Sequence, residues 1–215
     1  MFYYLSQHPE LELSSQKEIH YYNYHRFNGK DLNWYKSFFP LRGTAKKSGE
    51  ASPYYLFDPR VPEQLKQDIP NVKLIALLRN PIDRAYSAYS MNARRVSGSF
   101  PSFEQAIANQ DMSQEASRLY LWRGLYAQHI ESWLRYFARD QFLFIKAEEF
   151  FMDPKTVLRD VYHFLDISEV FPHNLRAQEV GEYAELQPQL RGELEDFFSA
   201  PNRTLADLLG PRFSW

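Results

Sequence analysis

The stretch that most constrains the fold of this chain spans residues 72–81 and reads Val-Lys-Leu-Ile-Ala-Leu-Leu-Arg-Asn-Pro. Its apolar run Leu74–Leu78 fits a central strand of a parallel sheet, because helices cover such strands on both faces. Helical patterns alternate with sparse apolar runs along the chain, and Gln141–Lys146 is a second such run. This alternation predicts an α/β layer fold with a parallel sheet.

A helix is expected directly after the first strand. Asn80 suits the N-cap, Pro81 the first helical position and Asp83 the position of a capping-box acid, and the pattern continues to about Arg95. Arg79 then lies at the carboxyl end of a strand and beside the positive end of a helix, where open α/β sheets bind anions. We interpret it as a phosphate or sulfate site, the alternative being an arginine paired with a nearby carboxylate.

Apolar spacing and cap residues predict further helices, and residues 12–45 and 172–185 lack a clear period. The expected helices are 1–8, 60–69, a short one from Ser102 to near Asn109, a long amphipathic one through Leu119–Phe137, Asp153–Leu165, Pro188–Phe198 and 203–209. There is no internal repeat or low-complexity linker, so we expect one domain over residues 1–215.

Composition excludes several classes of protein. The chain has no cysteine, so disulfides and thiolate metal sites are impossible, and a cytoplasmic location suits it. No apolar run approaches the ~18 residues of a membrane span. The net charge of −2 argues against a broad basic surface for nucleic acid. The six histidines are scattered without metal-ligand spacing, and no Walker-type loop is present, so no metal is expected.

The segment Lys17-Glu18-Ile19-His20 is a candidate for acid–base chemistry. If the segment is extended, Glu18 and His20 point to the same side, and either could take a proton from a hydroxyl group. A charged surface turn is the alternative interpretation.

Other candidates have structural alternatives of equal weight or more. A helical serine such as Ser87 more often bonds back to a carbonyl or faces solvent. Glu50 and Ser52 could line a pocket or belong to a capped turn. Gly124 interrupts a helical pattern at a cost of about 1 kcal/mol relative to alanine, which either close packing or an approaching ligand would explain.

Together these segments resemble the sulfotransferase family, most closely its heparan-sulfate-type branch and bacterial relatives. The resemblance covers nearly the whole chain, and its phosphate motif combined with Lys-Glu-x-His is more specific than any single piece. The matching segments are Leu5–Pro9, Lys17–His20, Gly49–Tyr54, Leu77–Ser87, Arg123–Tyr126, Trp133 with Phe137, Asp153–Leu165, Asn202–Leu205 and Phe213–Trp215.

The resemblance implies a P-loop-like, three-layer α/β fold with a central parallel sheet. It also implies sulfuryl transfer from 3′-phosphoadenosine 5′-phosphosulfate (PAPS) to a hydroxyl or amine, leaving adenosine 3′,5′-bisphosphate. Glu18 would be the general base, with His20 nearby. Lys17, Glu50 and Ser52 would lie on the side of the acceptor, a small molecule or a carbohydrate.

The resemblance further implies a donor site. Arg79 and Ser87 would hold the 3′-phosphate of PAPS, and Gly181 and Tyr183 would belong to the loop that closes over the donor. Before that glycine the heparan sulfate enzymes carry a lysine, where this chain has Val180, so we expect weaker closure here.

The family begins with a strand and a lysine-bearing loop that cradles the 5′-phosphosulfate. This chain starts after both, so we expect an N-terminally truncated fold with weak donor binding and slow turnover. The alternative is a non-catalytic module that binds the bisphosphate. A nucleoside or sugar kinase is disfavoured by the missing Walker loop. The acceptor's identity and the oligomeric state do not follow from the sequence.

Overall fold

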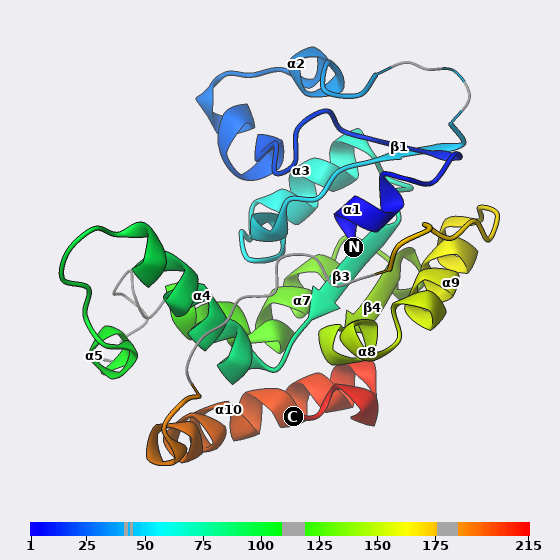
Figure 1. Cartoon of the computed structure of the whole chain (residues 1–215). Helices are drawn as coiled ribbons and strands as arrows, with labels where there is room; N and C mark the ends of the chain where they lie inside the picture. Colours follow the sequence, from blue (N-terminus) through cyan, green and yellow to red (C-terminus); the bar gives the residue numbers. More distant parts are fainter. Residues whose placement is uncertain (41–42, 44, 109–118, 176–184) are drawn as a thin grey trace. The chain divides into compact units, whose positions relative to one another are not determined.

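The computed structural model describes residues 1–40, 43, 45–108, 119–175 and 185–215 (Figure 1). The chain divides into two compact units. The first comprises Met1–Ala76, His129–Ile145 and Glu149–Arg176, and the second comprises Leu77–Gln128, Lys146–Glu148 and Ala177–Trp215. A single domain over residues 1–215 stays a prediction.

The first unit contains one pair of strands and most of a second pair. β1 (Leu11–Leu13) runs parallel to β2 (Lys47–Gly49), with Leu11 opposite Lys47. β3 (Leu74–Leu78) is hydrogen-bonded to β4 (Phe142–Lys146), and their arrows point the same way in Figure 1. Parallel strands among helices confirm the predicted α/β class, although the β1–β2 pair itself was not expected from the sequence.

The helices of the first unit are short apart from two. They are α1 (Phe2–Leu5), α2 (Leu32–Lys36), α3 (Val61–Asp68) and α9 (Pro154–Leu165), with a π-helical turn at Tyr21–His25 and 3-10 turns at Arg26–Asn28, Pro53–Leu56 and Arg139–Gln141. Both α3 and α9 match their predicted ranges closely. α9 begins as expected, with Asp153 Oδ1 accepting from the Thr156 N–H at 3.1 Å.

The second unit is built from helices. They are α4 (Pro81–Arg95), α5 (Phe103–Ile107) and α10 (Pro188–Leu209), with 3-10 turns at Trp122–Gly124 and Pro211–Phe213. Four elements, the strands β3 and β4 and the helices α7 (Tyr126–Leu134) and α8 (Ala147–Met152), have residues in both units. α8 follows β4 without a break and was not predicted.

Each unit has its own apolar core. In the first, α1 and α9 pack on β4, with Leu5, Val161 and Tyr162 against Ile145. In the second, the face of α4 that carries Ile82 and Ala85 packs with residues of α5 and α10. The first core includes Ile145 near the end of β4, and the second includes Ile82 just after β3, so each core holds a segment that adjoins a strand end.

A proline inside the last helix does not end it. The sequence predicts two helices, Pro188–Phe198 and 203–209, but α10 is continuous with Pro201 inside it. Because Pro201 has no N–H, it removes one helical hydrogen bond and costs about 3 kcal/mol. The continuous helix buries Phe198 and Leu205 fully, at a gain of about 1.5–3 kcal/mol each, which offsets that cost.

Two other predictions about elements are wrong. The stripe Leu119–Phe137 does not form one long helix, because Trp122–Gly124 is a 3-10 turn and α7 begins only at Tyr126. β3 is not covered on both faces by the described residues, since Leu77 is 37% exposed. Among the described strands, β3 pairs with β4 alone.

Gly124 has a packing role. A Cβ at this position would lie 2.8 Å from Cε1 of Phe198 and 2.9 Å from Cβ of Pro81. Real Cβ atoms do not approach other atoms so closely, so only glycine lets α4, α10 and this turn meet here. Of the two explanations that the sequence left open, close packing accounts for Gly124.

Candidate functional sites

The Lys17–His20 segment of the first unit is a tight loop, so the premise that it is extended is wrong. Glu18 has φ 58° and His20 has φ 55°, both in the left-handed region, which costs a non-glycine residue about 1–2 kcal/mol. The side chains nevertheless meet. Glu18 Oε2 lies 3.6 Å from His20 Nε2, and Glu18 Oε1 lies 3.7 Å from Lys17 Nζ.

Two hydrogen bonds fix this loop against residues 50–52. The Glu18 N–H donates to the Ala51 carbonyl at 3.0 Å, and the His20 N–H donates to Ser52 Oγ at 3.4 Å. Ile19, between them, is 1% exposed and so lies in the core. Burial of Ile19 together with these bonds explains how left-handed residues persist on both sides of it.

The His20 ring is oriented by its neighbours. Its Nδ1 lies 3.3 Å from the Asn23 side-chain oxygen, and its Nε2 is turned toward Glu18. Tyr54 packs edge-on against the ring at 5.3 Å between centroids. Glu18 and His20 stay about one-third exposed, so a solvent-borne substrate can reach both.

Glu50 is the most completely hydrogen-bonded carboxylate of the first unit's candidates. Tyr35 and Tyr55 donate to its Oε1 at 2.8 and 2.9 Å, and the Ser52 hydroxyl donates to its Oε2 at 2.7 Å. Burial raises the pKa of Glu50, and the three donors act against that shift. Burial and the nearby Glu50 charge also raise the pKa values of Tyr35 and Tyr55. The structure therefore brings Glu50 and Ser52 behind the Lys17–His20 loop.

In the second unit, the end of β3 leads into α4 as predicted. The Asn80 side chain accepts from the backbone N–H groups of Ile82 and Asp83 at 2.9 and 3.3 Å, and Pro81 occupies the first helical position. The expected capping-box bond from Asp83 is absent among the described residues. The Asn80 N–H instead donates to Glu148 Oε1 at 2.7 Å.

Asp83 has a different partner. Arg191 of α10 donates to its carboxylate at 2.6 Å. A capping-box acid must turn back toward the N-cap, and this ion pair holds Asp83 away from it. The acid that caps Asn80 therefore comes from α8, far along the chain, where no local pattern reveals it.

Arg79 and Ser87 both lie in the second unit and are half-buried. The Arg79 carbonyl accepts from the Tyr126 hydroxyl at 2.9 Å, which fixes the backbone at the strand end. The Ser87 hydroxyl has no hydrogen-bond partner among the described residues, whereas Ser90, three residues on, bonds back to the Tyr86 carbonyl at 2.8 Å. The Ser90 hydroxyl is therefore used within the helix, whereas the Ser87 hydroxyl is available to a ligand.

Arg84 is a residue that the sequence did not single out. Its guanidinium donates to the Tyr120 carbonyl, and its Nε is buried without a hydrogen-bond partner among the described residues. Burial lowers the pKa of Arg84, and the nearby charges of Arg123 and Arg79 lower it further. Three guanidinium groups thus share one region of the second unit, which favours an anion there.

The predicted donor-loop residues Gly181 and Tyr183 lie outside the described residues, as does Val180, so their roles stay predictions. Within the described ranges, no group of three or more His, Asp or Glu side chains could hold a metal ion. In the same ranges, none of the helices combines the length and the apolar character needed to cross a membrane.

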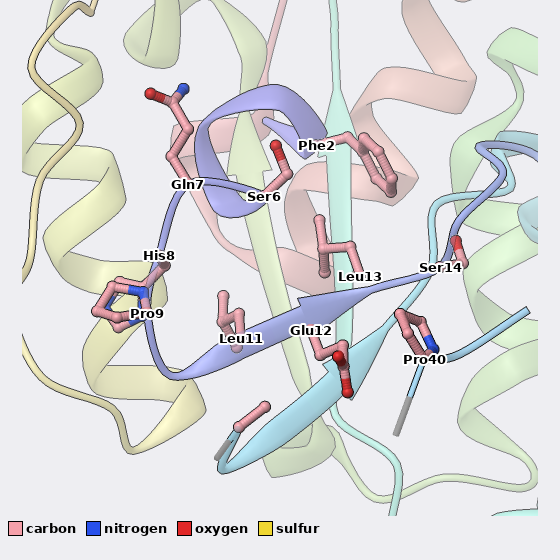
Figure 2. Close-up of a pocket in the computed structure, with 11 residues that line it drawn as sticks. Phe2, Ser6, Gln7, His8, Pro9, Leu11, Glu12, Leu13, Ser14 and Pro40 are labelled. Atoms are coloured by element: carbon pink, nitrogen blue, oxygen red, sulfur yellow. The ribbon is translucent and has the colours of Figure 1, made fainter. Parts of the chain in front are cut away.

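A pocket of about 370 Å³ lies beside α1 and β1 in the first unit (Figure 2). Its lining residues are Phe2, Ser6, Gln7, His8, Pro9, Leu11, Glu12, Leu13, Ser14, Pro40 and Ala45, which include none of the predicted site residues. His8 is committed to the fold: its Nδ1 accepts from the Glu10 N–H at 3.1 Å, and its Nε2 donates to the Ser168 carbonyl at 2.8 Å. The pocket therefore offers no histidine for catalysis.

The first unit places a carboxylate beside an imidazole, and the second places three arginines near one another after a strand. Such groups are typical of a group-transfer enzyme. The model of the sulfotransferase domain matches residues 4–189. The chain belongs to the sulfotransferase family, a family of transferase enzymes. This confirms the resemblance seen in the sequence.

Known proteins agree with this assignment over nearly the whole chain. The crystal structure of a sulfotransferase from Alicyclobacillus acidocaldarius is 32% identical, with a TM-score of 0.82 over 96% of this chain and 88% of that one. Human heparan sulfate glucosamine 3-O-sulfotransferase 6 is 28% identical over 99% of this chain and 68% of its own length. The bifunctional heparan sulfate N-deacetylase/N-sulfotransferase 1 of Caenorhabditis elegans is 27% identical over 96% of this chain and 27% of its own length.

Proposed function

We propose that the chain transfers a sulfuryl group from PAPS to a hydroxyl, or an amine, of an acceptor. The observation that carries this proposal is the anchored Glu18 carboxylate, one-third exposed and 3.6 Å from His20 Nε2, in a chain of the sulfotransferase family. A carboxylate so placed can accept a proton from an attacking hydroxyl group.

In the proposed reaction, the acceptor oxygen forms a bond to sulfur while the bond from sulfur to the bridging phosphate oxygen breaks. The acceptor's proton passes to Glu18, and adenosine 3′,5′-bisphosphate leaves with the electron pair of the broken bond. Lys17, 3.7 Å from Glu18, places a positive charge beside the negative charge that develops on the transferred group. Little covalent chemistry falls to the protein, so positioning and charge stabilisation dominate.

The donor's 3′-phosphate is assigned to Arg79 and Ser87. The support is the half-buried cation after β3, the available Ser87 hydroxyl, and the added positive field of Arg84 and Arg123. An arginine pairs with a phosphate through two parallel hydrogen bonds, which fixes orientation as well as affinity. Gly181 and Tyr183 are proposed to close over the donor.

For the acceptor we propose a small molecule or a carbohydrate of low negative charge. The human relative is named for heparan sulfate, a polyanion, but this chain has a net charge of −2. Several cations of the first unit are also already paired, including Arg26 with Asp68, Arg60 with Asp58 and Lys46 with Glu10. A cytoplasmic location, suggested by the lack of cysteine, is part of the same proposal.

The test is a transfer assay with radiolabelled PAPS and a panel of acceptors, namely phenols, neutral sugars, amino sugars and heparan sulfate fragments. We expect labelled product and stoichiometric release of adenosine 3′,5′-bisphosphate, with neutral acceptors preferred. Phosphate transfer from ATP in the same panel would contradict the proposal. Binding of the bisphosphate without transfer to any acceptor would instead support the non-catalytic module.

A further inference from the structure

We propose that Glu50 is a positioning residue for the proposed catalytic loop and does not contact the acceptor. Through Ser52 and Ala51 it fixes the loop that carries Glu18 and His20. This inference rests on the proposed function, in which Glu18 is the base. It departs from the expectation, drawn from the family resemblance, that Glu50 and Ser52 bind the substrate.

The Glu50 carboxylate is already occupied by the protein. Both oxygens are in use, with Tyr35 and Tyr55 on Oε1 and Ser52 on Oε2, all within 2.9 Å. A largely buried carboxylate with both oxygens hydrogen-bonded is expensive to disturb, because removing any donor leaves part of its charge without a partner. A substrate hydroxyl would have to displace one of these bonds.

The hydrogen bond from Ser52 links Glu50 to the Lys17–His20 loop. Because the Ser52 hydroxyl proton points to Glu50 Oε2, a lone pair of Ser52 Oγ is free to accept the His20 N–H at 3.4 Å. A hydroxyl can otherwise rotate, so Glu50 selects the rotamer that meets His20. The direction of the Ser52 hydroxyl and the position of the His20 backbone are thus coupled.

The same short segment also holds the other end of the loop. Ala51, between Glu50 and Ser52, accepts the Glu18 N–H at 3.0 Å. The two left-handed residues would otherwise relax toward ordinary backbone angles and carry the Glu18 carboxylate with them. Residues 50–52 therefore determine where the proposed base points.

Surrounding tyrosines hold Glu50 itself in place. Tyr35 stacks on Tyr21 with 4.8 Å between centroids and an angle of 20°, and Tyr22 packs edge-on against Tyr55 at 5.7 Å. Tyr21 and Tyr22 are almost fully buried and follow His20 directly in the chain. The two tyrosines that bond Glu50 are thus packed on the residues that continue the catalytic loop.

The experiment compares wild type with Glu50→Gln and Ser52→Ala, with Ser52→Thr as the conservative rescue and Ser37→Ala as a matched control. Ser37 is exposed, and its hydroxyl bonds only to the Trp34 carbonyl among the described residues. We expect Glu50→Gln and Ser52→Ala to lower kcat by about 10- to 100-fold, with the acceptor KM nearly unchanged. Ser52→Thr should recover most of kcat, and Ser37→Ala should match wild type.

A second measurement does not depend on turnover. Amide hydrogen exchange at Glu18 should quicken by about fivefold in Ser52→Ala, the equivalent of one net hydrogen bond, although Ser52 does not bond Glu18. An acceptor KM that rises with kcat unchanged, or Glu18 exchange that stays at the wild-type rate, would overturn the positioning role. Failure of the proposed function would show differently, as absence of transfer by wild type.

Discussion

Glu18 Oε2 and His20 Nε2 face each other across 3.6 Å, although both residues have left-handed backbones. An extended segment would also place these two side chains on one side. Here Ile19 points into the core and the two polar neighbours reach solvent. The loop therefore presents a carboxylate and an imidazole together while its backbone is held from behind.

Arg79→Ala should weaken binding of adenosine 3′,5′-bisphosphate by about 10- to 100-fold, because a charge-assisted hydrogen bond contributes about 1.5–3 kcal/mol. Ser87→Ala should weaken it less, by about fivefold, since a neutral hydroxyl contributes about 1 kcal/mol. Isothermal titration calorimetry measures both. Ser90→Ala is the matched control on the same helix, and equal affinities for Arg79→Ala and wild type would refute the assignment of Arg79.

Gly124→Ala should destabilise the protein by about 1–3 kcal/mol, because the added Cβ would lie 2.8 Å from the Phe198 ring. Gly192→Ala is the matched control, since nothing lies within 4 Å of its added Cβ in α10. That substitution should stabilise the helix by about 0.5–1 kcal/mol. Urea unfolding measures both, and a Gly124→Ala protein as stable as wild type would contradict close packing.

Glu10 should contribute to stability in a pH-dependent way. Hydrogen bonds from Lys46 and then from Ser168 lower the pKa of Glu10 from 4.5 to about 2. A lowered folded-state pKa gives stability that is present above about pH 4.5 and is lost as pH falls toward 2. The stability difference between wild type and Glu10→Gln should therefore be constant at neutral pH and vanish in acid, and a difference that grows below pH 4.5 would contradict this.

Local signals in the sequence were enough for much of the fold. The Asn80-Pro81 and Asp153-Pro154 caps define the starts of α4 and α9, because the cap, the proline and the bonded N–H groups are only a few residues apart. The same reliance on local signals led to the wrong prediction of two helices around Pro201. Its cost is visible in the sequence, but the burial of Phe198 that offsets it depends on distant residues.

The candidate sites divide in the same way. Glu18, His20 and Arg79 were singled out through motifs and stay predictions, whereas Glu50 meets Ser52 and the tyrosines through contacts that no local pattern encodes. The bond from His20 to Ser52 spans 32 residues of sequence. Arg84 was missed because an arginine inside a helix gives no signal until its Nε is seen to be buried.

The central claim, that Glu18 is the base for sulfuryl transfer, is tested most directly by the single-turnover rate of transfer from PAPS in Glu18→Gln. Glu63→Gln, on the exposed face of α3, is the matched control. We predict a rate lower by about 10²- to 10⁴-fold for Glu18→Gln, the range for loss of a general base, with bisphosphate affinity and Tm near wild type. A Glu18→Gln enzyme that transfers sulfate at the wild-type rate would contradict the account.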